Sequence, residues 1–230
     1  QLMLGVGASK KTYLDDVFST YLFRGNATSR SITNGIDLAG EGGMTWIKNR
    51  DAASGQDIFD TVRGTGKRLT AESNAAQSNA GSCVNAFNSN GFGLGTDSMT
   101  NTNNEDYASW TFRKTKGFFD VVTWVGNETN RTISHSLGCV PGCIMIKCTD
   151  DNKAWTVYHR EVGPEKRLKL NDSDAEYDNS IYFQDTKPTS SSFSIGNSAD
   201  VNGMEGSTGL NYVAYVFAGG ESTAATARSV

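Results

Sequence analysis

The chain has little proline and histidine, with three prolines and two histidines among 230 residues. It also lacks any apolar run near the roughly 18 residues that a membrane-spanning helix needs. Lys and Arg number 21 against 25 Asp and Glu, which gives a net charge of −4, and the basic residues form no long cluster. The sequence therefore predicts neither membrane insertion nor a nucleic-acid interface, because such an interface requires a basic patch.

Cysteine is also scarce, and three of the four cysteines lie close together in the sequence, at positions 139, 143 and 148. Their spacing differs from the C-x₂-C pairs of a tetrahedral zinc site. Cys143 and Cys148 would point to opposite faces of a regular strand. We therefore predict that Cys83, Cys139, Cys143 and Cys148 are free and mostly buried, with a disulfide or a metal site as alternatives. Free thiols fit assembly in a reducing cytosol.

What the chain does contain is glycine, at 25 residues, and many Asn, Ser, Thr and Asp residues between short apolar runs. This composition is typical of many short strands joined by many turns. The aromatic content of 10% is too high for a disordered chain. We therefore predict an all-β protein.

An internal duplication organises the sequence. Residues 43–69 match residues 142–168 at a constant offset of 99 without a gap. A match of this length predicts two copies of one structural unit. The identical pairs in this stretch include Gly43 and Gly142, Lys48 and Lys147, Asp51 and Asp150, Gly64 and Gly163, Lys67 and Lys166, Arg68 and Arg167, and Leu69 and Leu168.

Each copy has its own succession of short alternating runs, which predicts two tandem β-sandwiches of the jelly-roll or lectin-like kind. Asn90-Gly91 is a strong signal for a hairpin. A helical turn at 13–18 is an alternative to extended structure there. The strands expected are residues 15–23, 45–48, 57–62, 68–69, 87–95 and 107–112 in the first copy, and 119–125, 144–147, 154–160, 167–170, 192–196 and 212–217 in the second.

The expected organisation is an N-terminal arm at 1–11, a first repeat at 12–117, a second repeat at 118–219 and a linker or tail at 220–230. We expect no strand in that tail. Only Arg113–Gly117 joins the repeats, so they should pack against each other.

The arm carries several apolar residues that would be unfavourable in a free tail. It is predicted to anchor the chain to a partner, the alternative being a disordered terminus. The proposed anchoring residues are Leu2, Met3, Leu4 and Val6.

Catalytic motifs are weak. His135 aligns with Asn34 of the first copy and His159 with Asp60, so neither histidine is duplicated. No G-x-S-x-G elbow is present. The Gly-Thr-Gly-Lys run at 64–67 lacks the spacing of a phosphate-binding loop, and the second copy loses its second glycine. We therefore predict no enzyme activity and no cofactor, and we interpret this run as a structural corner.

Two kinds of binding site remain as alternatives. The Asp- and Asn-rich loops at 101–106, 171–178 and 197–202 could hold Ca²⁺ through oxygen ligands, but no EF-hand register is present, and solvated turns with no metal are expected. The four tryptophans could form a sugar-stacking platform, although filling of the core is the favoured interpretation. They are Trp46, Trp110, Trp124 and Trp155, all expected on strands.

Three motifs of the second copy carry a family resemblance. They are V-G-N…T-I-S-H-S-L-G-x-x-P-G-x-I-M-I-K at 125–147, W-T-V-Y-H at 155–159 and F-S-I-G…Y-V-A-Y-V-F at 193–217. The pattern resembles a tandem β-domain of bacteriophage tail-fibre and other virion-associated proteins, of the marine or cyanobacterial phage type. It spans about residues 12–219, and the first copy departs from it at Asn34 and Asp60.

This resemblance implies a structural, non-enzymatic virion protein, the particle-attached N-terminal part of a tail fibre or appendage. Its implied partners are other virion proteins of the tail or capsid and further copies of the chain, commonly as a trimer. The implied location is the virion, assembled in the host cytoplasm. The alternative is a lectin-like, carbohydrate-binding module that contacts a host-surface glycan. The resemblance identifies no functional residues.

Overall fold

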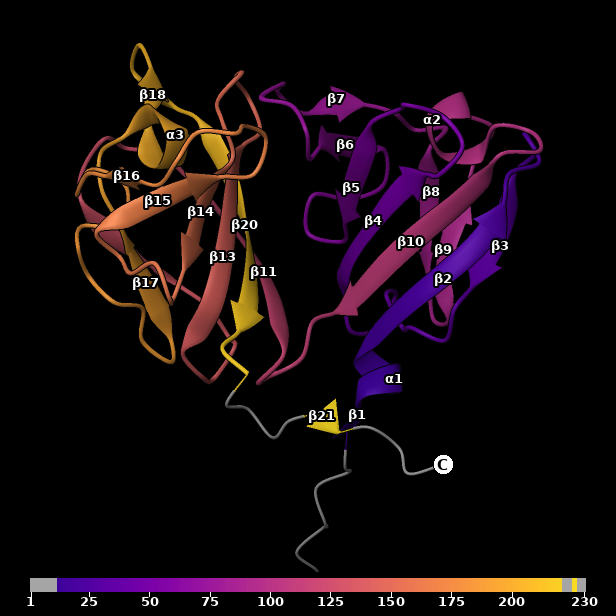
Figure 1. Cartoon of the computed structure of the whole chain (residues 1–230), viewed down its shortest axis with the longest axis horizontal. Helices are drawn as coiled ribbons and strands as arrows, with labels where there is room; N and C mark the ends of the chain where they lie inside the picture. Colours follow the sequence, from indigo (N-terminus) through magenta and orange to yellow (C-terminus); the bar gives the residue numbers. More distant parts are fainter. Residues whose placement is uncertain (1–11, 221–224, 227–230) are drawn as a thin grey trace, which may run out of the picture.

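The computed structural model of the chain describes residues 12–220 and 225–226. The predicted anchoring residues of the N-terminal arm lie outside this described part. Within it, the prediction of an all-β protein is confirmed, because two six-stranded antiparallel sheets and several smaller ones account for nearly all regular structure. Figure 1 shows two sandwiches side by side, the first repeat in indigo to magenta and the second in magenta to yellow.

The first repeat has a large sheet in the order β2-β10-β4-β5-β6-β7 and a small sheet in the order β3-β9-β8. Its elements are β1 (Thr12–Tyr13), α1 (Leu14–Val17), β2 (Phe18–Arg24), β3 (Arg30–Thr33), β4 (Gly43–Asn49), β5 (Gln56–Asp60), β6 (Lys67–Thr70), β7 (Ser78–Asn79), β8 (Val84–Asn88), β9 (Gly91–Leu94), α2 (Ser98–Asn101) and β10 (Asp106–Arg113).

The second repeat has a large sheet in the corresponding order, β11-β20-β13-β14-β15-β16, and a small sheet of β12 and β17. Its elements are β11 (Phe119–Val125), β12 (Arg131–Ser134), β13 (Pro141–Cys148), β14 (Thr156–His159), β15 (Lys166–Lys169), β16 (Tyr177–Asp178), β17 (Ser192–Ile195), α3 (Ala199–Asn202), β18 (Met204–Glu205), β19 (Thr208–Gly209), β20 (Asn211–Ala218) and β21 (Ala225–Thr226).

The last long strand of each repeat lies inside its large sheet. β10 pairs antiparallel with both β2 and β4, so Tyr107 lies opposite Phe23 on one side and Asn49 on the other. β20 pairs in the same way with β11 and β13. Since side chains alternate along a strand, Tyr107 and Ile47 point into the sandwich, whereas Met44 points to the outer face of the large sheet.

Several boundaries differ from those expected. The alternative of a helical turn before β2 is confirmed by α1, and the backbone N–H of Tyr13, just before this helix, donates to the carboxylate of Asp16 at 3.1 Å. The short strands β7 and β16 lie in stretches where no strand was expected. The expectation of a tail without strands is wrong at Ala225–Thr226, which pairs in parallel with β1. Two-residue strands such as these carry no alternation that sequence analysis could detect.

The repeats also differ from each other. The first repeat builds the Asn-Gly hairpin of β8 and β9 as predicted, whereas the second repeat has turns in place of β8. A small hairpin of β18 and β19 is inserted before β20. This insertion explains why the offset between the copies rises from 101 at Asn101 and Asn202 to 105 at Tyr107 and Tyr212.

Each sandwich encloses its own core of buried side chains. The first contains Phe23, Ile32, Ile36, Leu38, Ile47, Phe59, Cys83, Val84, Phe92, Leu94 and Tyr107. The second contains Trp124, Ile133, Leu137, Ile144, Ile146, Cys148, Tyr158, Tyr182, Phe183, Phe193, Ile195, Val201, Leu210, Tyr212, Ala214 and Val216.

A third core joins the repeats. It lies between the outer faces of the two large sheets, near the middle of Figure 1, so the central part of each large sheet is covered on both faces. Burial of this much apolar surface stabilises the contact between the repeats. Its buried members are Met44, Ile58, Leu69 and Ala71 from the first repeat and Phe119, Val121, Met145, Trp155, Val157, Val213 and Tyr215 from the second.

A buried polar cluster reinforces this shared core. The Tyr215 hydroxyl of the second repeat donates to Asp60 of the first at 2.7 Å and accepts from Nη2 of Arg63 at 3.0 Å. Arg63 also pairs with Asp60 at 2.5 Å. Burial raises the pKa of Tyr215 well above its usual value, so the hydroxyl remains protonated as a donor. All three side chains thus have hydrogen-bond partners, as buried polar groups require.

Candidate functional site

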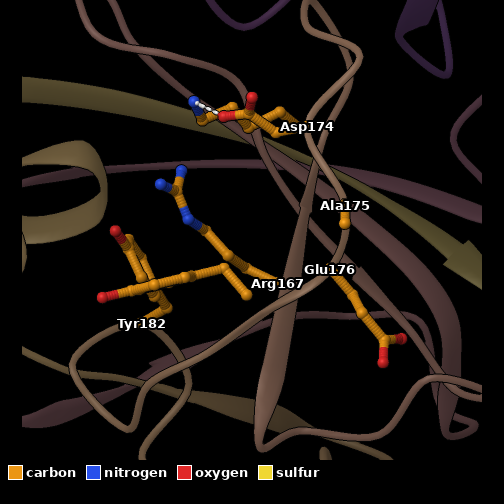
Figure 2. A pocket seen from close by; sticks show the side chains of 7 residues that line it. Arg167, Asp174, Ala175, Glu176 and Tyr182 are labelled. Carbon is orange, nitrogen blue, oxygen red and sulfur yellow. Dashed lines mark hydrogen bonds and ion pairs between the residues drawn. The ribbon is translucent and has the colours of Figure 1, made fainter.

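An open pocket with a volume of about 490 Å³ lies at the β15–β16 edge of the second repeat, and Figure 2 shows it from close by. Ligand pockets typically measure roughly 300–1,000 Å³. The floor comes from β15, one wall from the loop that leads into β16, and another from the turn after β16. The lining residues are Arg167, Lys169, Asp174, Ala175, Glu176, Tyr177 and Tyr182.

Arg167 is the central side chain of this pocket. Its guanidinium carbon lies 4.2 Å from the ring centroid of Tyr182 and 5.8 Å from that of Tyr177. Both distances fall within the range of a cation–π contact, about 6 Å. The guanidinium also pairs with Asp200 at 3.3 Å. These contacts hold the planar group in a fixed orientation along one wall, where Figure 2 shows it beside Tyr182.

The first repeat explains this orientation. There the matching arginine, Arg68, donates through Nε to Asp57 at 2.6 Å. In the second repeat, Thr156 occupies the position of Asp57. The Nε of Arg167 and the hydroxyl of Thr156 are both buried without a hydrogen-bond partner in the described structure. The arginine therefore contacts the tyrosines and Asp200 instead of a carboxylate on the neighbouring strand.

Two ion pairs hold the loop opposite Arg167. Lys169 pairs with Asp174 at 2.5 Å, the contact drawn in Figure 2, and Lys166 pairs with Glu176. Hydrogen bonds to the carboxylates raise the pKa of both lysines. Because these pairs are exposed, each contributes little to stability. Their effect is to position two carboxylates at the rim of the pocket.

The aromatic residues differ in exposure. Tyr177 is 52% exposed, whereas Tyr182 is 6% exposed, and their rings meet edge to face at 6.3 Å. Burial raises the pKa of Tyr182. The pocket thus offers one open ring face, a fixed guanidinium and two carboxylates. Such a set can bind a ligand that has both an apolar face and hydroxyl groups.

The corresponding surface of the first repeat contacts the second repeat. The backbone N–H groups of Ala76 and Gln77 donate to Asn152 and Thr149 of the second repeat. Arg167 has a counterpart of the same kind in Arg68, but most of the other lining residues do not, because Thr70, Ala75, Ser78 and Cys83 stand in place of Lys169, Asp174, Tyr177 and Tyr182. The pocket is therefore specific to the second repeat.

The structure keeps the two histidines in separate local settings. His135 is 7% exposed, its ring stacks on Phe193 at 6.4 Å, and its Nδ1 accepts from the backbone N–H of Leu137. Burial lowers the pKa of His135, which favours the neutral form. His159 is exposed at the end of β14, where its Nδ1 accepts from Glu161. These contacts do not bring the two histidines together.

The Gly-Thr-Gly-Lys corner has a structural role in both repeats. The N–H of Gly64 donates to the carbonyl of Asp60, and that of Gly163 donates to the carbonyl of His159. Their φ angles are +92° and +91°, a region that L-residues adopt only with strain. The interpretation of this run as a corner shared by both copies is therefore confirmed.

The cysteines are free thiols, as predicted. Cys83 and Cys148 are buried, and Cys139 and Cys143 are half-buried. Cys148 packs in the core of the second sandwich and Cys143 against the shared core, so they face opposite sides of β13 as expected. Burial raises the pKa of Cys83 to about 12 and that of Cys143 to about 11. These thiols are therefore poor nucleophiles.

Two tryptophans fill cores, as favoured. Trp124 stacks on Tyr212 and donates to the carbonyl of Val201 at 3.0 Å. Trp155 is fully buried in the shared core and donates to the carbonyl of Thr70 in the first repeat at 2.9 Å. The expectation that it lies on a strand is wrong, because β14 begins one residue later.

Trp46 and Trp110 are only half-buried. Their rings meet edge to face at 6.4 Å on the outer face of the first large sheet. Trp46 packs against the shared core, and Nε1 of Trp46 is buried without a hydrogen-bond partner in the described residues. The four tryptophans therefore form no common platform.

Two asparagines of the Asn-rich loops link neighbouring backbone segments through their side-chain amides. The expectation of solvated turns is wrong for Asn101 and Asn202, which are fully buried. The amide of Asn101 donates to the carbonyls of Thr28 and Gly95, and Asn202 makes the equivalent bonds in the second repeat. Over residues 12–220 and 225–226, no group of three or more His, Cys, Asp or Glu side chains is arranged to hold a metal.

Sequence reasoning missed the pocket around Arg167. The duplication did align Arg68 with Arg167, and the replacement of Asp57 by Thr156 was visible as the loss of a partner on a neighbouring strand. Tyr177 lay in a segment interpreted as a loop, and Tyr182 lay between the expected strands of the second repeat. Their approach to Arg167 depends on the pairing of β15 with β16, which leaves no periodic signal.

Comparisons with known proteins add a family. Neither the comparison with curated proteins nor the comparison with solved structures gave a significant match. In the described residues, no helix has the length and apolar character to cross a membrane. One family model matches residues 14–224, which includes both repeats. The chain therefore belongs to the family described as Domain of unknown function (DUF7483).

Proposed function

We propose that this chain is a structural, non-enzymatic virion protein that forms the particle-attached part of a tail fibre or similar appendage. The observation that carries the proposal is the shared core between the repeats, which makes two sandwiches one mechanical unit. An appendage has to hold its far end at a defined position relative to the particle. A freely hinged pair of domains would not do so. The motif resemblance described above supplies the virion context.

A surface feature supports attachment at one end. An apolar hollow of about 240 Å³ lies beside α1, lined chiefly by Leu14, Phe112, Phe118 and Phe217. Leu14 is 41% exposed. The pairing of β1 with β21 lies at this same end in Figure 1. Apolar surface of this kind is suited to contact with another virion protein.

Immunogold electron microscopy of intact particles tests the proposal. We expect label at the base of an appendage, and label absent from purified particles would refute the virion role. Deletion of residues 1–11 should prevent incorporation into particles, whereas a matched deletion of residues 228–230 should not. Normal incorporation of the chain without its arm would refute the anchoring role of Leu2, Met3, Leu4 and Val6.

The same proposal includes assembly with further copies of the chain. Sedimentation equilibrium of the purified protein is expected to give a mass that is a small multiple of the 24.7 kDa chain. A monomer at all concentrations would count against this part of the proposal. Attachment to other virion proteins would then be tested separately, by the electron microscopy of particles described above.

A second candidate function, carbohydrate binding at a host surface, is favoured by one specific observation. The pocket on the second repeat combines the open ring of Tyr177 with the fixed guanidinium of Arg167. A screen of the purified chain on immobilised glycans tests this candidate. Saturable binding to any glycan would support it, and absence of binding across the screen would leave the structural role alone.

A further inference from the structure

We propose that the Arg167–Tyr177–Tyr182 pocket binds a neutral saccharide, at one site per chain that is present in the second repeat and absent from the first. The proposal rests on the carbohydrate-binding candidate above and specifies its site, its ligand class and its stoichiometry. Neither the family assignment nor the duplication implies any of these three.

The charges of the pocket favour a neutral ligand. Its lining carries two cations, Arg167 and Lys169, and two anions, Asp174 and Glu176. Each of these groups has an oppositely charged partner within the second repeat. An anionic ligand would have to displace a carboxylate from one of these pairs, and a cationic ligand would have to displace an arginine or a lysine. A neutral ligand needs neither exchange.

The polar groups favour hydroxyls. Arginine and lysine only donate hydrogen bonds, ionised carboxylates only accept them, and a hydroxyl does both. Adjacent hydroxyls on a sugar ring can therefore accept from Arg167 and donate to Asp174 or Glu176 without disturbing either ion pair. Because Arg167 is already held against Tyr182, little conformational entropy is lost when a ligand binds it.

The open ring of Tyr177 supplies the apolar contact. About half of this side chain is exposed, and it is one of the few large hydrophobic side chains exposed in the second repeat. A saccharide ring has one face of C–H groups that can pack on an aromatic ring. A purely structural role for Tyr177 is disfavoured by the first repeat, where Ser78 at the same position forms the same two-strand pairing.

The two repeats explain the predicted stoichiometry. In the first repeat the matching surface contacts the second repeat through Ala76 and Gln77. It also lacks both tyrosines, since Ser78 and Cys83 replace them. The duplication therefore produced one surface that joins the repeats and one that remains open to a ligand.

The test uses the full chain on an array of neutral and acidic oligosaccharides, followed by calorimetric titration of the strongest binder. We expect a neutral oligosaccharide to bind, with one site per chain and an affinity that changes little between low and high salt. Tyr177→Ala should weaken binding roughly tenfold, the size expected for loss of an exposed aromatic anchor. Tyr177→Phe should retain binding, since the ring face is kept.

Two further variants complete the test, one as a control and one as a second change in the pocket. Tyr21→Ala removes a comparably exposed tyrosine, 37% exposed, from the first repeat and should leave binding unchanged. Arg167→Lys keeps the positive charge but removes the planar fork, so it should also weaken binding. Circular dichroism spectra like that of the parent establish that each variant is folded.

Each contrary outcome overturns a different statement. Binding to no saccharide would remove both this inference and the carbohydrate-binding candidate. Stronger, salt-sensitive binding to an acidic saccharide that depends on Tyr177 would keep the candidate and overturn the neutral ligand. Two sites per chain would overturn the restriction to the second repeat. Binding unaffected by Tyr177→Ala would overturn the assignment of the pocket.

Discussion

At the scale of single residues, one hydroxyl links the second repeat to a buried ion pair of the first. Tyr215 of the second repeat is hydrogen-bonded to both members of the Asp60–Arg63 pair of the first. A buried ion pair is favourable only when its remaining hydrogen-bonding groups are satisfied. Tyr215 supplies one of those partners from across the interface, which couples the folding of one repeat to the presence of the other.

Tyr215→Phe should therefore destabilise the protein. It removes a hydrogen bond to a charged group while keeping the ring in the shared core, so we expect the free energy of unfolding to fall by about 1–3 kcal/mol. Urea denaturation measures this change. Tyr21→Phe, at an exposed site, is the matched control. A loss from Tyr215→Phe no larger than that from the control would show that the hydroxyl contributes little.

A buried lysine makes the stability of the protein depend on pH. Lys147 is fully buried, and its Nζ donates to the carbonyls of Cys148 and Asp151. Burial lowers its pKa to about 8 from the 10.5 of an exposed lysine. Below about pH 8 both the folded and the unfolded states are protonated. Between pH 8 and 10.5 the unfolded state binds more protons, so this lysine's contribution to stability rises with pH.

Lys147→Met should remove that contribution. The difference in unfolding free energy between the parent and Lys147→Met should shift in favour of the parent as the pH rises from 7 toward 10, since only the parent releases this proton on folding. Urea denaturation at several pH values measures the difference. Lys187→Met, at an exposed site, should give a difference that stays nearly constant. A constant difference for Lys147→Met would contradict the prediction.

At the scale of elements, the corner between β5 and β6 contains two glycines at positive φ, and Gly64 is the one that the second repeat also has. A Cβ at Gly64 would meet no atom within 4 Å, so the cost of a substitution comes from its φ of +92° alone. Gly163 has the same conformation at the same corner of the second repeat. Their match explains why this glycine is kept in both copies.

Gly64→Ala should destabilise the protein by about 1–2 kcal/mol, the strain of a left-handed conformation in an L-residue. Gly81→Ala is a suitable control, because its Cβ would also meet no atom within 4 Å and its φ lies outside the strained range. Thermal unfolding of both variants gives the comparison. Equal effects would show that strain does not decide the conformation of this corner.

Sequence patterns predict local elements here but not their partners. Alternating residues located β4, β10, β13 and β20, and the Asn-Gly pair located the hairpin of β8 and β9. The insertion of β10 between β2 and β4 left no local signal, because it joins segments about 60 residues or more apart in the chain. The cluster of Asp60, Arg63 and Tyr215 depends on such a non-local contact, whereas the pocket around Arg167 depends on the short pairing of β15 with β16, which leaves no periodic signal. Neither arrangement could therefore be predicted from local sequence patterns.

At the scale of the whole molecule, the shared core makes the repeats interdependent. Four buried residues of the first repeat and seven of the second form it. Without its partner, each repeat would expose the apolar outer face of its large sheet. Apolar patches of this size are uncommon on monomeric proteins and lead to association. The two sandwiches should therefore be one thermodynamic unit.

Scanning calorimetry tests this unity. The full chain should unfold in one transition, with calorimetric and van't Hoff enthalpies that agree. Met145→Asp should place a charge in the shared core and separate the unfolding into two transitions. Val140→Asp, at a residue that is 50% exposed, should preserve the single transition. Two transitions in the parent protein would contradict the proposed coupling.

The central position of β10 has a further consequence during synthesis. β2 and β4 leave the ribosome first, but the strand that fills the gap between them is the last of its repeat. Until β10 emerges, which takes on the order of several seconds at ordinary translation rates, both strands present unpaired backbone edges. β20 repeats the delay in the second half. The nascent chain therefore has two periods in which it is open to mispairing, and molecular chaperones would be most useful to it then.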